Sequence, residues 1–198
     1  MKTNLVYLLA AGLALAAPLV LARSTQAAPP VSPPSGDWRK AVAERAPLYG
    51  HRNWIAIVDS AYPAQSRSGI ETIVADADQA EVVKAVLQAL AGSKHVRPLI
   101  YTDAELAYVD EHDAPGVGAY RKQLAQVLAG RPANSLLHEQ IIHKLDEAGQ
   151  TFRILIVKTN MAIPYTSVFL QLDCKYWSAD AEQRLRARMP VPIPEAKP

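Results

Sequence analysis

The feature that most constrains this chain is a regular alternation of strand-like and helix-like segments across its middle part. Short runs rich in β-branched and aromatic residues, each bounded by polar or turn residues, predict strands. These runs are residues 54–58, 70–74, 97–101, 153–157 and 167–172. Helices between strands allow parallel pairing and cover the faces of a sheet. We therefore expect a three-layer α/β/α domain with a mainly parallel or mixed central sheet.

The helical segments are marked by capping residues and by apolar spacing. Asp78 can cap a helix N-terminus, Glu81 stands at the capping-box position, and Gly92 ends the apolar repeat between them. Further helices are predicted over 119–129, 135–148 and 179–189. Composition agrees, because 49% hydrophobic and 20% charged residues in 198 fit one ordinary globular domain.

Both ends of the chain differ in composition from this domain. Residues 1–28 are typical of a secretory signal peptide, with Lys2 before an apolar run and small residues near Ala27 for cleavage. The alternative is an uncleaved membrane anchor. Residues 29–36 form a proline-rich linker, 37–189 form the α/β domain, and 190–198 form a proline-rich tail. We expect a secreted or periplasmic protein that leaves the membrane after signal cleavage.

Charge and cysteine content exclude several classes of protein. Removing residues 1–28 takes away two basic side chains, Lys2 and Arg23, and leaves basic and acidic residues equal in number. Without a basic block, the chain lacks the electrostatic footprint of a nucleic-acid-binding or anionic-membrane-binding protein. Cys174 is the single cysteine, so the chain forms no internal disulfide and no cysteine-rich zinc site.

The segment 50–66 carries the residues most suggestive of chemistry. His51 follows Gly50 and precedes an apolar strand, and Asp59 stands where that strand ends. Ligands of open α/β sheets gather at the carboxyl ends of strands, so Asp59 has a favoured position. A strand-end carboxylate also serves often as a loop cap, and a histidine before a strand is often only structural.

Further motifs follow this segment along the chain in a fixed order. Asp59 follows His51 at a spacing of eight residues, and the turn at 62–66 reads Tyr-Pro-Ala-Gln-Ser. Asp76 closes an Ile-Val-Ala-Asp stretch, and His143 precedes Tyr165 in a Tyr-Thr-Ser motif. Over residues 43–172 this series resembles the ribose pyranase and fucose mutarotase (RbsD/FucU) family, and the chain looks like a diverged, exported member.

The resemblance implies sugar chemistry without a cofactor or a metal. Members interconvert anomers or ring forms of a monosaccharide, which requires acid/base opening and closing of a hemiacetal. A histidine suits this because both of its protonation states are populated near neutral pH. Members also form ring-shaped homo-oligomers with the site at a subunit interface. We expect a carbohydrate mutarotase or pyranase-like isomerase with these properties.

The resemblance also assigns roles to individual residues. His51 is expected to be the principal acid/base group and Asp59 to orient it. His143 and Tyr165 are expected to be the second proton donor or sugar contacts. The expected substrate-binding residues are Tyr62, Asp76 and Ser167.

Two departures from the family pattern keep other functions open. Val74 replaces an arginine, and Ser167 replaces an asparagine, so two groups that can bind sugar hydroxyls are lost. The alternatives are a non-catalytic carbohydrate-binding module and a cell-envelope scaffold on the same fold. An acidic cluster at 110–113 could hold an ion, but we expect a solvated loop there.

Overall fold

The computed structural model describes residues 37–190. The predicted signal peptide (1–28), the predicted linker (29–36) and residues 191–198 of the predicted tail lie outside the described residues. Among the residues described, no helix combines the length and the apolar character needed to cross a bilayer.

The described chain contains helices and strands in alternating order. The α-helices are α1 (Trp38–Arg45), α2 (Gln79–Ala91), α3 (Val117–Val127), α4 (His138–Ala148) and α5 (Ala179–Arg188). The strands are β1 (Trp54–Val58), β2 (Ile70–Val74), β3 (Val96–Asp103), β4 (Ala133–Leu136), β5 (Ile154–Lys158) and β6 (Val168–Cys174). Short 3-10 turns occupy Ala46–Leu48 and Ala104–Tyr108.

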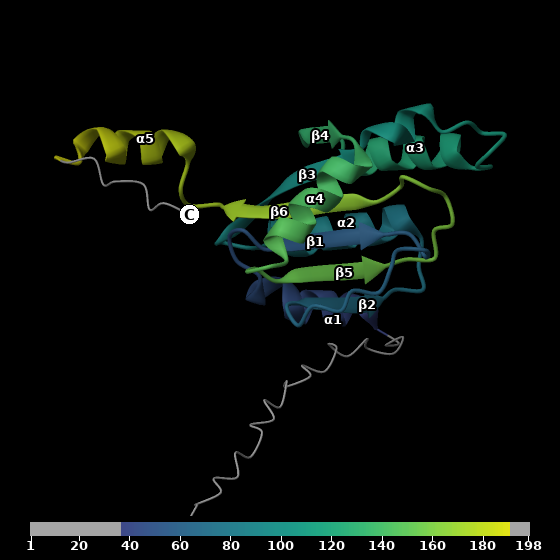
Figure 1. The fold of residues 1–198 in the computed structure, drawn as a ribbon, viewed down its shortest axis with the longest axis horizontal. Coiled ribbons are helices and arrows are strands. Elements are labelled where there is room, and N and C mark those ends of the chain that lie inside the picture. Colours follow the sequence, from purple (N-terminus) through teal and green to yellow (C-terminus); the bar gives the residue numbers. More distant parts are fainter. Residues whose placement is uncertain (1–36, 191–198) are drawn as a thin grey trace, which may run out of the picture.

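All six strands form one mixed sheet in the order β2-β5-β1-β6-β3-β4. Strand β1 pairs in parallel with β5, β5 with β2, and β3 with β4. Strand β6 runs antiparallel to both of its neighbours, β1 and β3. Figure 1 shows the arrows of β1 and β5 pointing one way and the arrow of β6 pointing the other. Five strands therefore place their carboxyl ends at one edge of the sheet.

Helices cover both faces of this sheet (Figure 1). Helices α1, α2 and α3 pack on one face, where Ile55 and Ile57 of β1 belong to the larger apolar cluster. Helix α4 packs on the other face, where Ala56 and Val58 belong to the smaller cluster. Alternate residues of one strand thus enter opposite cores, as the pleat of a β-strand requires. The expected three-layer α/β/α domain is confirmed.

The local predictions hold best where apolar spacing is strong. Helix α2 begins after Asp78, whose carboxylate accepts the N–H groups of Ala80 and Glu81 as predicted. The five predicted strands are present within a few residues of their expected ends.

Two elements differ from the prediction. Helix α1 was not anticipated, because only Trp38 and Val42 among its residues are buried and its other residues give a weak apolar pattern. The helix predicted over 135–148 begins only at His138, because residues 133–136 form the short edge strand β4. This strand is mostly exposed and polar, so it lacks the alternation that identifies a strand in a sequence.

Helix α5 confirms the helix predicted over 179–189, but it does not contribute to either core. None of its residues is buried, and Figure 1 shows it standing apart from the sheet beyond the end of β6.

Candidate functional site

The carboxyl edge of the sheet gathers chemically capable side chains from several elements. Asp59 follows β1, Asp103 is the last residue of β3, and His138 begins α4 directly after β4. Tyr165 lies in the loop that leads into β6, which enters the sheet at this same edge because it runs antiparallel. The position matches the edge at which α/β sheets bind ligands.

The centre of this group is a pair formed by Asp103 and His138. His138 Nδ1 lies 3.2 Å from Asp103 Oδ1, and the Asp103 side chain is wholly buried whereas that of His138 is 29% exposed. The backbone N–H of His138 donates to both carboxylate oxygens of Glu105, each at 3.0 Å. This second carboxylate satisfies an N-terminal N–H of α4 and so fixes the backbone that carries the imidazole.

Burial raises the pKa of the Asp103 carboxyl from 3.8 to about 6. The His138 ring opposes this shift, whereas the carboxylates of Glu105 and Asp59 add to it. Desolvation disfavours the charged form of a carboxyl, and neighbouring negative charges do the same. Asp103 is thus a carboxyl whose proton affinity is tuned toward neutral pH by its place in the fold.

Tyr165 stands beside this pair. Its ring meets the His138 ring edge-on, with centroids 5.8 Å apart, and 39% of the residue is exposed. Its φ angle of 58° lies in the left-handed region, which residues other than glycine rarely occupy. A strained backbone of this kind persists only where the surroundings hold it, and it often marks a functional position.

A buried polar network supplies that support. The amide of Gln79 donates to the carbonyls of Ile57 and Thr166, and its oxygen accepts from the Thr159 hydroxyl. The Tyr120 hydroxyl also donates to the Thr166 carbonyl, at 2.6 Å. Gln79 therefore ties the start of α2 to the ends of β1 and β5 and to the residue that follows Tyr165.

Asp59 and Tyr62 flank the pair as parts of one turn. The Asp59 carboxylate accepts the N–H of Ala61 at 2.8 Å, so it acts at least as a turn cap. Tyr62 is half-buried against the core beneath α4, and burial raises its pKa to about 12, with the Asp146, Asp59 and Asp103 carboxylates adding to the shift. Its phenol is consequently a neutral donor and acceptor at physiological pH.

His51 lies at the opposite edge of the sheet from Asp59. It precedes β1, and its imidazole is 54% exposed with Nε2 3.9 Å from Asp173 Oδ1. The whole of β1, which is about 13 Å long from Trp54 to Val58, lies between His51 and Asp59. The expected pairing of His51 with Asp59 therefore does not form within one chain.

His143 is also apart from Tyr165. It lies on the outer side of α4, 74% exposed, with Nε2 3.2 Å from Glu147 Oε1. The histidine that contacts Tyr165 is His138, which begins the same helix. Because the turns of a helix rotate each position by about 100°, two histidines five residues apart point in different directions.

The remaining predicted residues occupy the expected edge without contacting the pair. Asp76 is exposed just after β2, and Ser167 is buried immediately before β6. The expectation that they bind substrate stays a prediction.

Sequence analysis missed the residues at the centre of the site. The strand predicted over 97–101 extends to Asp103, so the rule that singled out Asp59, a carboxylate at the end of a buried strand, applies to Asp103 as well. His138 gave a weaker signal, because its partner is 35 positions away in the sequence and only the tertiary fold brings the two together.

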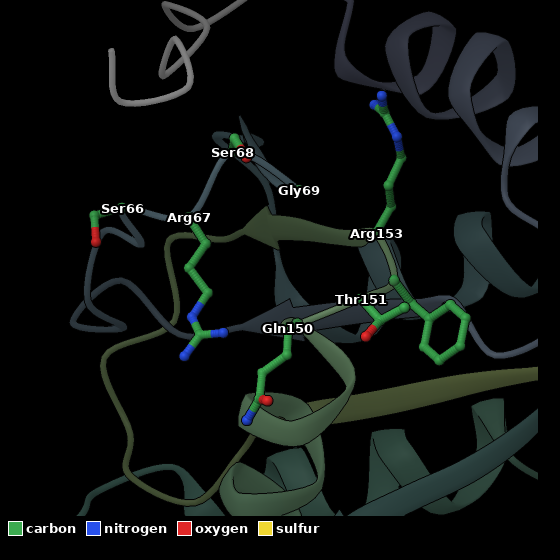
Figure 2. Close-up of a pocket in the computed structure, with 9 residues that line it drawn as sticks. Ser66, Arg67, Ser68, Gly69, Gln150, Thr151 and Arg153 are labelled. Atoms are coloured by element: carbon green, nitrogen blue, oxygen red, sulfur yellow. The ribbon is translucent and has the colours of Figure 1, made fainter. Parts of the chain in front are cut away.

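A polar cavity of about 580 Å³ lies at the other edge of the sheet, between the segments 66–69 and 149–153. Figure 2 shows the side chains of Arg67 and Gln150 directed toward a common space, while Arg153 extends away from it. The two arginines do not converge on one point. This cavity contains none of the predicted site residues.

Among residues 37–190, no cluster of three or more histidine, cysteine, aspartate or glutamate side chains has the geometry to hold a metal ion. The acidic segment predicted as a solvated loop contains His112 and Asp113, whose side chains are 92% and 78% exposed.

Known family models and curated proteins give no match to this chain. Solved structures do give matches. The chain is similar to RbsD of Bacillus subtilis in complex with D-ribose, at 15% identity and a TM-score of 0.46 over 70% of this chain and 92% of that one. It is also similar to the fucose mutarotase of Streptococcus pneumoniae in complex with L-fucose, at 21% identity and a TM-score of 0.44 with the same coverage. A third match is FucU of Bifidobacterium longum, at 16% identity and a TM-score of 0.45 over 70% and 93%.

The geometry of the carboxyl edge defines what this group of side chains can do. A partly exposed imidazole, backed by a buried carboxyl, can act as a general acid or a general base. The neighbouring phenol of Tyr165 can donate or accept a hydrogen bond, and its ring offers an apolar face. Such a set suits reversible proton transfer to a small polar molecule.

Proposed function

We propose that this chain is a carbohydrate mutarotase or pyranase-like isomerase that opens and closes the hemiacetal ring of a monosaccharide without a cofactor. The observation that carries the proposal is the juxtaposition of the partly exposed His138 with the buried Asp103 and the exposed Tyr165. The sequence resemblance to the ribose pyranase and fucose mutarotase family supports the same chemistry. The proposal includes export, on the basis of the signal-like residues 1–28.

The proposed reaction is a balanced pair of proton transfers. A base removes the proton of the anomeric hydroxyl, the bond between the anomeric carbon and the ring oxygen breaks, and an acid protonates that ring oxygen. The product is the open-chain carbonyl form, and reversal on the other face gives the second anomer. We assign the proton transfer at one of these oxygens to His138 and place Tyr165 as the second donor or a sugar contact.

His51 retains a role in this proposal through a second copy of the chain. The imidazole is 54% exposed at the amino edge of the sheet, far from the carboxyl edge of its own chain. A neighbouring copy could present His51 to the edge that carries Asp59, His138 and Tyr165. The proposed site is therefore shared between subunits of a homo-oligomer.

The distribution of charge supports such head-to-tail assembly. Basic residues predominate at the amino edge of the sheet, where one acidic residue, Asp173 of β6, lies among Arg52, Arg67, Lys94, Arg131, Arg153 and Lys175. Acidic residues predominate at the carboxyl edge, where Asp59, Asp76, Asp78 and Glu105 lie with one basic residue, Lys158 at the end of β5. Opposite charges on the two edges favour contact between the amino edge of one copy and the carboxyl edge of the next.

A second candidate function is a non-catalytic monosaccharide-binding module. The observation that favours it is the replacement of a family arginine by Val74 and of a family asparagine by Ser167. Loss of donors that bind specific hydroxyls weakens the discrimination of a sugar site. The two candidates differ in one measurable property, the rate of ring opening.

Exchange spectroscopy by NMR tests the proposal. Exchange between anomers is measured for a panel of free aldoses and ketoses, including D-ribose and L-fucose, with and without the protein. We expect faster exchange for at least one sugar and a slower rate with Tyr165→Phe. Binding of a sugar without faster exchange would favour the binding module, and neither binding nor exchange would favour a scaffold.

A further inference from the structure

Asp103 is a buried carboxylate whose hydrogen-bonding capacity is unmet in the described part of the chain. Its side chain has no exposed surface, and neither of its two oxygens forms a well-directed hydrogen bond there. A buried carboxylate normally accepts several hydrogen bonds, because removal from water without compensation is costly. Such a group in the middle of a site calls for a specific explanation.

The imidazole of His138 is positioned to donate a hydrogen bond to the Asp103 carboxylate. Nδ1 of His138 is itself buried and without a hydrogen bond in the described chain, and it lies 3.2 Å from Asp103 Oδ1. The distance is that of a hydrogen bond, and a modest rotation of the imidazole brings an Nδ1–H into line with the oxygen. Each group is thus positioned to satisfy the other.

The other carboxylates nearby are already engaged. Glu105 accepts the backbone N–H of His138 with both oxygens, and Asp59 accepts the N–H of Ala61. Neither is paired with the imidazole. An ionised carboxylate can only accept, so the nitrogen that faces Asp103 must carry the proton.

We propose that Asp103 is a positioning residue that holds His138 as the Nδ1–H tautomer and thereby leaves Nε2 free to exchange protons with the ligand. Asp103 contacts no ligand in this arrangement and acts only through the imidazole. The inference rests on the proposed function for its catalytic consequence. Its structural part, the tautomer, is independent of that function.

Buried carboxylate–histidine pairs have a known physical effect. The carboxylate selects one tautomer, fixes the orientation of the ring and stabilises the imidazolium that forms when Nε2 takes a proton. Tyr165, which contacts the edge of the same ring, limits its rotation from the other side. The imidazole is consequently held between a buried acceptor and an aromatic ring before any ligand binds.

The test combines a spectroscopic signature with a graded series of variants. The ¹⁵N chemical shifts of His138, measured at a pH at which the ring is neutral, identify the nitrogen that carries the proton. We expect the Nδ1–H tautomer in the wild type. Asp103→Asn keeps a hydrogen-bond acceptor and should retain part of the preference for this tautomer. Asp103→Leu replaces the carboxyl with an apolar side chain of similar size and should lose the preference.

The kinetic counterpart uses the sugar that the exchange panel identifies. We expect about a 10- to 100-fold lower kcat in Asp103→Leu with KM changed by less than about twofold, and a smaller loss in Asp103→Asn. If Asp103→Leu fails to fold, the Asn variant alone decides, because its weakened preference for the Nδ1–H tautomer should be accompanied by a lower kcat.

The chain offers a matched control in an exposed pair of the same kind. His112 Nδ1 lies 3.1 Å from Asp113 Oδ1, but both side chains are highly exposed. Asp113→Asn should leave the His138 spectrum and the exchange rate unchanged. An Nε2–H tautomer at His138 in the wild type, or one unaltered by Asp103→Leu, would overturn the inference. Absence of sugar exchange with the expected tautomer present would instead count against the proposed function alone.

Discussion

His51 and Asp59 lie beyond opposite ends of the same strand, β1, so a single subunit cannot bring the imidazole and the carboxylate together. Within its own chain, His51 faces Asp173, which Arg97 already engages through two guanidinium nitrogens. The carboxyl edge, in contrast, carries its own imidazole in His138. The use of both histidines in one reaction therefore depends on contact between copies.

Subunit complementation tests that dependence. His51→Ala and His138→Ala should each slow exchange between sugar anomers. Co-expression of the two variants should restore about a quarter of the wild-type rate. With random assembly, about a quarter of the sites between subunits receive an intact His51 from one copy and an intact His138 from the other. Co-expression of His138→Ala with Tyr165→Phe is the control, because both residues come from the same side of the proposed site. Recovery in the control, or none with the first pair, would contradict a site shared in this way.

The two histidines of α4 should differ sharply in effect. His138→Ala removes the imidazole at the centre of the site and should lower the exchange rate by about 10²-fold or more, the usual contribution of an acid/base group. His143→Ala removes an exposed ring paired with Glu147 and should change the rate by less than about twofold. Rates from exchange NMR at one sugar concentration are sufficient for the comparison. A large loss with His143→Ala would restore the original sequence-based assignment.

Asp103 should make stability depend on pH. Its folded-state pKa of about 6 lies above the ordinary value of 3.8, so protonation favours the folded state and stability falls as pH rises from about 4 to about 6. The change amounts to at most about 3 kcal/mol, set by burial together with the facing groups His138, Glu105 and Asp59.

The variant Asp103→Asn checks that dependence, because it mimics the protonated form at every pH. Urea denaturation should show similar stability for both proteins near pH 4 and a more stable variant above pH 6. The same variant should be the slower enzyme, a trade of stability for activity that is common in functional sites. A wild type as stable as the variant at pH 8 would refute the prediction.

The Tyr120 hydroxyl should contribute measurably to the stability of the loop that carries Tyr165. Tyr120→Phe removes the buried hydrogen bond to the Thr166 carbonyl, which keeps its second bond from Gln79. We expect a loss of about 1 kcal/mol in the free energy of unfolding. The control is Tyr108→Phe, because Tyr108 is 88% exposed and should show no loss. Equal effects of the two variants would show that the bond to Thr166 does not stabilise the loop.

Several parts of the fold follow from local sequence. Strand β1 is recognisable because both of its faces enter apolar cores, and α2 because Asp78 caps it and valines and leucines recur along one side. Helix α1 and strand β4 were not recognisable, since each buries few side chains and is held in place by its neighbours. The apolar pattern of a sequence reports burial, so an element with little burial is found only where another signal marks it, as prolines mark the end of the charged helix α5.

The sequence by itself determined the alternation of elements, the strand-end position of Asp59 and the resemblance that points to sugar chemistry. Only the tertiary structure decided which histidine meets Tyr165, which carboxylate backs it, and that His51 faces the other edge of the sheet. The physical reason is that the sequence sets the distance between two residues on one strand, whereas the residues of a site come from different strands. Which strands are neighbours is decided by the tertiary fold. Asp103 and His138 become neighbours because β3 and β4 pair in parallel and end at the same edge.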